Sequence, residues 1–115
     1  MANWQHVYFL LMGVHYLCDF PLQTHAIAHE KSRHSKTDLQ KHVPWPYWLT
    51  AHAAVHGLGV ALVTGSAFLG LLEMIAHWLI DLGKCEKWYS IHVDQTLHAL
   101  CKFAWVLVYI NMTMR

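Results

Sequence analysis

Residues 73–84 read EMIAHWLIDLGK and place a histidine, His77, one helical turn before an aspartate, Asp81, inside a strongly apolar run. Side chains four residues apart lie on one face of a helix, so both polar groups can point to the same place. The same step recurs in three other apolar segments. These further pairs are His15 with Asp19, His52 with His56, and Asp94 with His98. The recurrence predicts four helices that each direct two potential ligands toward a common site.

Charged side chains are scarce in this chain of 115 residues, of which 56% are hydrophobic and 13% are charged. In an ordinary soluble domain about a quarter of the residues are charged. A small domain also exposes much of its surface, which charged groups must cover. From residue 1 to residue 29, Asp19 is the only aspartate, glutamate, lysine or arginine. The composition therefore predicts an integral membrane protein that has the lipid bilayer as a partner.

Other compositional features exclude several classes of protein. The net charge of +1 provides no basic face for nucleic acid. Cys18, Cys85 and Cys101 are odd in number and lack paired spacing, so we interpret them as small apolar residues or free thiols. The N-terminal apolar stretch has no basic segment before it, so we expect it to be retained as a helix and not cleaved as a signal peptide.

Apolar runs bounded by proline, glycine and polar residues predict an all-α four-helix bundle that forms one domain over residues 1–115. Pro21 is expected to end the first helix and Gly83 the third. The polar segment between the first two helices is partly helical in this prediction and closes on Pro44-Trp-Pro-Tyr-Trp48. The predicted long helices cover residues 4–20, 47–63, 67–82 and 93–112, and a short amphipathic helix covers residues 24–41.

The directions of the helices place all four ligand pairs at one depth. In an up-down-up-down bundle, the end of the first helix and the start of the second share one side, as do the end of the third and the start of the fourth. The pairs occupy these four ends, and the two connections on that side carry the basic loop residues. Positive loops favour the cytoplasm. We therefore expect a multi-pass inner-membrane protein with its site facing the cytoplasm and both termini outside.

Eight inward polar side chains, five histidines and three aspartates, would satisfy one another best around a metal. Neutral imidazole and carboxylate groups suit Zn, Fe, Mn or Ni, and we expect one or two divalent ions, with zinc favoured. Without a metal, the same groups could form a hydrogen-bonded network or a path for protons or ions. The predicted metal ligands are His15, Asp19, His52, His56, His77, Asp81, Asp94 and His98.

Three further side chains, Glu73, Lys84 and Lys102, are candidates for catalysis. Glu73 lies one turn before a predicted ligand and could act as a general base or as a hydrogen-bond partner. Lys84 and Lys102 could hold an anionic substrate, although Lys84 could instead extend to the membrane interface. Gln95 could orient a neighbouring ligand by hydrogen bonding. Four other histidines are expected to be solvated: His25, His29, His34 and His42.

Four motifs occur in a fixed order along the chain. They are His15-x3-Asp19-Phe20-x-Leu22-Gln23, His52-x3-His56-Gly57, His77-x2-Ile80-Asp81-x2-Lys84 and Asp94-Gln95-x2-His98. Together they resemble a family of small helical membrane proteins from bacteriophages and bacteria, known as a domain of unknown function. The resemblance covers about residues 7–105 and implies a polytopic membrane protein of phage or bacterial origin. It implies no activity.

The sequence favours a membrane-embedded, metal-dependent hydrolase that acts at the cytoplasmic interface on an ester, amide or phosphoester of a lipid-like or amphiphilic substrate. A di-iron oxygenase would use similar ligands, usually with more carboxylates. A transporter or channel for divalent metal ions or protons could use the same cluster for transit. A non-catalytic phage membrane protein, holin-like or an exclusion factor, could use it structurally. Two histidines could also bind haem, and a homo-oligomer is compatible with each alternative.

Overall fold

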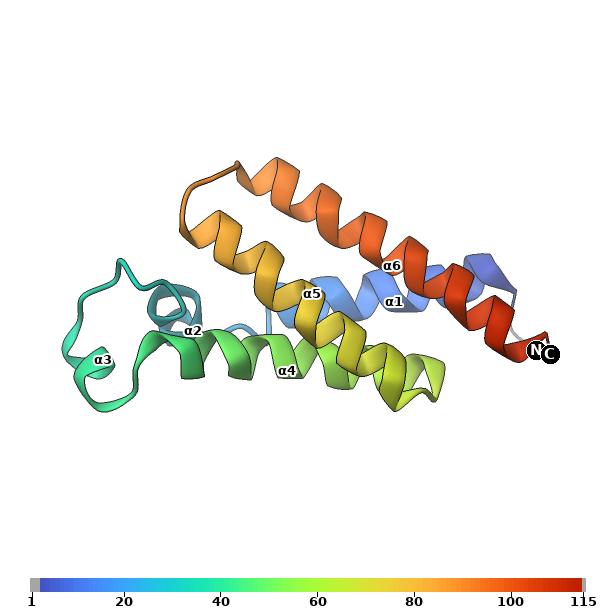
Figure 1. Ribbon diagram of the computed structural model, residues 1–115, viewed down its shortest axis with the longest axis horizontal. Coiled ribbons are helices and arrows are strands. Elements are labelled where there is room, and N and C mark those ends of the chain that lie inside the picture. The colour runs from blue at the N-terminus through green and yellow to red at the C-terminus, as the bar shows by residue number, and fades with distance from the viewer. Residues whose placement is uncertain (1–2, 115) are drawn as a thin grey trace.

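The computed structural model describes residues 3–114, which form four long and two short helices (Figure 1). The first two residues and the last residue of the predicted domain lie outside this range. The described part of the chain is all-α, as the sequence predicts. The helices are α1 (Trp4–Asp19), α2 (His25–Glu30), α3 (Asp38–His42), α4 (Trp45–Thr64), α5 (Ala67–Cys85) and α6 (Ile91–Thr113).

The four long helices run alternately up and down, with α1 packed against α4 and α6, and α5 packed against the same two helices. The start of α1 and the end of α6 therefore lie at the same end of the bundle (Figure 1). The short helices α2 and α3 lie at the opposite end, and α2 contacts α4. This arrangement confirms the predicted helix order and places the four ligand pairs in one half of the bundle.

Polar residues before the helices fix where they begin. The side chains of Asn3, Ser66 and Ser90 accept hydrogen bonds from backbone N–H groups in the first turns of α1, α5 and α6. At the far end of α4, Gly65 adopts a φ of 71°, a left-handed conformation that glycine tolerates well. The long helices match the predicted ranges closely, except that α5 continues through Gly83 to Cys85.

The segment predicted as one amphipathic helix over residues 24–41 is instead two short helices, α2 and α3, separated by irregular chain. The polar side chains of this segment bind backbone and side-chain groups locally, which competes with helix formation. The Gln40 amide donates to the carbonyl oxygens of Glu30 and Ser32 at 3.1 and 2.9 Å, and the Thr37 hydroxyl donates to the Glu30 carboxylate at 2.6 Å. The prediction of a continuous helix here is therefore wrong.

Within residues 3–114, no helix has both the length and the apolarity that a membrane crossing requires. A spanning helix needs about 20 predominantly apolar residues. Helix α1 has only 16 residues, and the longer helices carry histidines, carboxylates or lysines on their inward faces. The predicted integral membrane bundle is therefore wrong, and so is the predicted multi-pass placement in the inner membrane with a cytoplasmic site and both termini outside.

The interior of the bundle is divided into an apolar half and a polar half. The apolar half is a cluster of buried side chains, Val7, Leu11, Val60, Leu69 and Val106, at the end where α1 begins and α6 finishes. The polar half holds the predicted ligands, while many large apolar side chains face outward, such as Phe9 and Leu62. The division follows from the sequence, because each ligand pair lies farther from that end of the bundle than the apolar cluster residues of the same helix do.

Helices α4 and α5 touch backbone to backbone at Gly57 and Gly70. A methyl group on either glycine would lie 2.6 Å from the carbonyl oxygen of the other. This approach brings the rings of His56 and His77 to a centroid distance of 3.6 Å. We therefore expect Gly57→Ala to lower the free energy of unfolding by about 1–3 kcal/mol, because the helices must separate to admit the methyl group.

The matched control for this prediction is Gly13→Ala in α1, where an added methyl group meets nothing within 4 Å. This change should leave stability unchanged or raise it by up to about 1 kcal/mol, since alanine favours helix over glycine. Urea unfolding of both variants and the parent protein makes the comparison. Equal stability of Gly57→Ala and Gly13→Ala would contradict the close-packing argument.

Candidate metal centre

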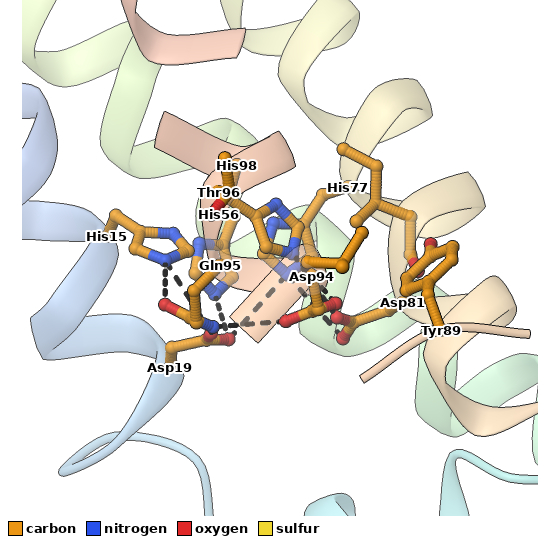
Figure 2. A network of polar contacts seen from close by, with 12 residues as sticks. His15, Asp19, His56, His77, Asp81, Tyr89, Asp94, Gln95, Thr96 and His98 are labelled. Carbon is orange, nitrogen blue, oxygen red and sulfur yellow. Dashed lines mark hydrogen bonds and ion pairs between the residues drawn. The ribbon is translucent and has the colours of Figure 1, made fainter. Parts of the chain in front are cut away.

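The structure brings all eight predicted metal ligands together in the polar half of the bundle. Figure 2 labels all of them except His52. Each long helix contributes one pair, and the side chains of a pair point inward from one face because they are four residues apart. None of the eight residues is more than 6% exposed. The convergence of the four pairs therefore matches the spacing argument, although metal binding by them stays a prediction.

Four of these side chains form a compact group around the Asp19 carboxylate. Its Oδ1 atom lies 3.1 Å from Nε2 of His52, 3.2 Å from Nε2 of His56 and 3.7 Å from Nε2 of His77. All four ligand atoms lie within 4.8 Å of one another. Ligand atoms on a tetrahedral ion with bonds of about 2.0–2.1 Å are separated by roughly 3.3 Å. The three separations from Asp19 are therefore close to those around one tetrahedral ion.

Two nitrogens of this group, Nε2 of His56 and Nε2 of His77, are buried and have no hydrogen-bond partner within the described residues. On the other side of its ring, His77 places Nδ1 3.2 Å from Oε1 of Glu73. If Nδ1 donates its proton to Glu73, the lone pair of Nε2 faces the carboxylates of Asp19 and Asp81. A lone pair and carboxylates repel each other unless a cation or proton lies between them.

Glu73 is itself held rigidly by two partners from α6. The Lys102 ammonium lies 2.5 Å from Oε1, and the Trp105 indole N–H donates to Oε2 at 2.7 Å. Burial alone would raise the pKa of Glu73, but its hydrogen bond with His77 and the nearby Lys102 charge hold that pKa below its usual range. A charged carboxylate that binds Nδ1 of a histidine is the usual support for a metal-binding imidazole.

The other half of the cluster contains Asp81, Asp94 and His98. Nε2 of His98 lies 3.4 Å from Oδ1 of Asp81 and 3.5 Å from Oδ1 of Asp94. The Gln95 amide connects the halves, because it donates to Oδ2 of Asp19 at 2.8 Å and to Oδ2 of Asp94 at 3.1 Å. Asp19 also belongs to a possible ligand group with Asp94 and His98. The Asp19 carboxylate is therefore shared between both halves.

The electrostatic environment favours the protonation states that bind a metal. Burial lowers the pKa of His15 to about 4 and that of His56 to about 3, so both rings are neutral at neutral pH. Burial opposes ionisation of Asp19 and Asp81, but hydrogen bonds from histidines outweigh this effect and hold both pKa values well below the usual range. Neutral imidazoles beside charged carboxylates are the forms in which these side chains coordinate cations.

The family model described as "Protein of unknown function (DUF3307)" matches residues 7–114. The chain belongs to this family. The match confirms the predicted resemblance to a family of unknown function, and the matched range includes all eight candidate ligands. No curated protein and no solved structure matches the chain. The bacterial or phage origin expected from the resemblance stays a prediction.

The remaining candidate residues of this DUF3307 chain occupy different environments. Lys102 is buried and paired with Glu73, whereas Lys84 is half-buried in the last turn of α5. Among residues 3–114, no hydrogen bond or ion pair joins Lys84 to the cluster, so the structure does not bring it together with the other candidates. The four histidines expected to be solvated are all exposed: His25, His29, His34 and His42.

Sequence reasoning missed Lys31, whose Nζ atom lies 2.7 Å from Oδ2 of Asp81 and 2.7 Å from Oε1 of Gln23. It was expected among the basic residues of a loop, yet its side chain is only 4% exposed. Gln23 belongs to the first of the four motifs on which the predicted resemblance rests, and this was the one available signal for the contact. No pattern in the sequence indicated that the indole N–H of Trp105 donates a hydrogen bond to Glu73.

Proposed function

We propose that this protein is a metal-dependent hydrolase whose divalent ion, best suited by zinc, is held by Asp19, His52, His56 and His77. The observation that carries the proposal is the spacing of these four ligand atoms, together with the unpartnered Nε2 atoms of two of the histidines. Buried polar atoms are almost always hydrogen-bonded. An ion at the centre of the group would satisfy both nitrogens at once.

The charge balance of the interior also supports a divalent cation. Among the described residues, the polar half buries the carboxylates of Asp19, Glu73, Asp81 and Asp94 and only two ammonium groups. A fifth buried carboxylate, that of Glu30 in α2, accepts a hydrogen bond from Thr37 outside the cluster. Lys102 pairs with Glu73, and Lys31 pairs with Asp81. Asp19 and Asp94 are left without a lysine, although buried charges need compensation. One divalent ion would balance these two negative charges.

Hydrolysis is proposed because the cluster holds more polar groups than a structural ion uses. Four protein ligands alone close a structural zinc site, so hydrolysis requires that the ion take up water as a fifth ligand or exchange one of the four ligands for it. A divalent ion in this position would supply a Lewis acid, which lowers the pKa of a bound water. His98 lies beside the group and could transfer a proton. Burial opposes protonation of its ring, but the neighbouring carboxylates of Asp81 and Asp94 outweigh burial and raise the pKa of His98.

The positions of Glu73 and Lys102 suggest how they would contribute. Both are engaged with each other, so we propose that they position His77 and do not take part in proton transfer or substrate binding. The substrate class proposed is an ester, amide or phosphoester. Haem is a poorer fit, because a porphyrin must lie between two ligating histidines, whereas the ring of His77 stacks on those of His56 and His98 with centroids 3.6 and 4.1 Å apart.

The test begins with elemental analysis of protein purified without chelator. We expect about one zinc or related divalent ion per chain, removable by chelator and restored by added zinc. Each form is then assayed on chromogenic esters, anilides and phosphoesters, and turnover should require the metal-loaded form. Protein that neither retains nor takes up an ion would refute the metal site. Stoichiometric metal without turnover on any of these substrates would refute the hydrolase assignment.

A further inference from the structure

A lysine enters the polar cluster from outside the four long helices. Lys31 follows directly after α2, and its ammonium reaches the buried carboxylate of Asp81 in α5. The rest of its segment is fixed over the same region by Glu86. Arg33 donates to both oxygens of that carboxylate at 2.5 and 2.8 Å, and His34 lies 3.1 Å from Oε2. The position of the ammonium is therefore well supported.

The Lys31 ammonium lies next to a second set of possible metal ligands, which includes Asp81, Asp94 and His98. The two contacts of His98 Nε2, with Asp81 Oδ1 and with Asp94 Oδ1, are 3.4 and 3.5 Å. These two separations are close to the roughly 3.3 Å expected between ligands of one tetrahedral ion. Asp19, Asp94 and His98 also place one ligand atom each within 4.8 Å of one another. Asp94 is 0% exposed, and its Oδ1 has no hydrogen-bond partner within the described residues. A buried acceptor without a donor is a position where a cation would bind.

We infer that Asp19, Asp81, Asp94 and His98 form a second divalent-cation position, and that the Lys31 ammonium competes with this second ion for the charge of Asp81. This inference rests on the proposed function, because Asp19 would be shared with the first ion. Shared carboxylates suit paired ions about 3.5–4 Å apart. With the Lys31 ammonium in place, one divalent ion balances the negative charge left on the carboxylates of the polar half. Without its charge, the polar half carries one more negative charge and admits another ion.

The inference is tested by zinc titration of metal-free protein, followed by calorimetry and by elemental analysis after gel filtration. The wild-type chain should bind about one zinc tightly, and Lys31→Met should bind about two, with the second at least about tenfold tighter than in the wild type. Lys36→Met is the matched control, because Lys36 is an exposed lysine of the same segment. It should bind zinc as the wild type does.

Two further variants keep the test decisive. Lys31→Gln also removes the charge but can still donate a hydrogen bond to Asp81, so it replaces Lys31→Met if the latter does not fold. Adding Asp94→Asn to either variant should restore a stoichiometry of about one. Folded Lys31 variants that still bind a single zinc would overturn the second position while leaving the first intact. A wild-type chain that binds no zinc would instead refute the proposed function.

Discussion

Replacing Asp19 with asparagine is expected to lower the affinity for zinc by about 100-fold or more. The loss of an outer partner of a metal ligand already costs 10–100-fold in affinity, and Asp19 is expected to bind the ion directly. Its carboxylate is the atom group that three histidine nitrogens face. Asparagine keeps the size of the side chain but removes the negative charge, so the change tests coordination more than packing.

Competition of each variant with a chromophoric zinc chelator would measure this affinity. Asp38→Asn is the matched control, because Asp38 lies exposed in α3 and forms an ion pair with Lys41 at the surface. It should bind zinc with the wild-type affinity. Circular dichroism establishes that both variants are helical. An Asp19→Asn chain that folds and binds zinc as tightly as Asp38→Asn would remove Asp19 from the centre.

The ligand pairs could be predicted from sequence because they depend on two simple regularities. Residues four apart share a helix face, and the short connection at Gly65 makes α4 and α5 antiparallel neighbours. These two rules predict that His52 and His77 lie at the same level of the bundle, and they require no knowledge of tertiary contacts. Pro21 gave the end of α1 nearly correctly, because proline disfavours a helical residue before it, whereas α5 continues through Gly83.

The failed predictions have physical causes of a different kind. Low charge content was interpreted as evidence of membrane crossing, but hydropathy must be sustained along each helix, and inward polar groups such as His77 and Glu73 interrupt it in the described helices. The burial of Lys31 depends on a contact with Asp81, fifty positions away in the chain. No local pattern encodes such a contact, so a lysine in a polar segment is predicted to be solvated.

Replacing Lys102 with methionine is expected to destabilise the fold by about 3–5 kcal/mol, because the change leaves the Glu73 carboxylate buried without its cation. Glu73 is 0% exposed and Lys102 1% exposed, so water cannot compensate for the lost charge. Methionine retains most of the apolar stem, which limits the loss of packing. Lys84→Met is the control, since Lys84 has no ion pair within the described residues, and its effect should stay below about 1 kcal/mol.

A double-mutant cycle separates the charge from the packing. Glu73→Gln in the Lys102→Met background removes the uncompensated charge, so the double variant should recover a large part of the stability lost by Lys102→Met alone. The one oxygen of glutamine can accept the Trp105 N–H, and its NH2 group then donates to Nδ1 of His77, so the imidazole stays in place with its proton on Nε2. Denaturant unfolding of the metal-free proteins measures the free energy of unfolding of the parent, the two single variants and the double variant. Additive effects of the two substitutions would show that Lys102 contributes packing and not charge, and the positioning role proposed for this pair would then fail.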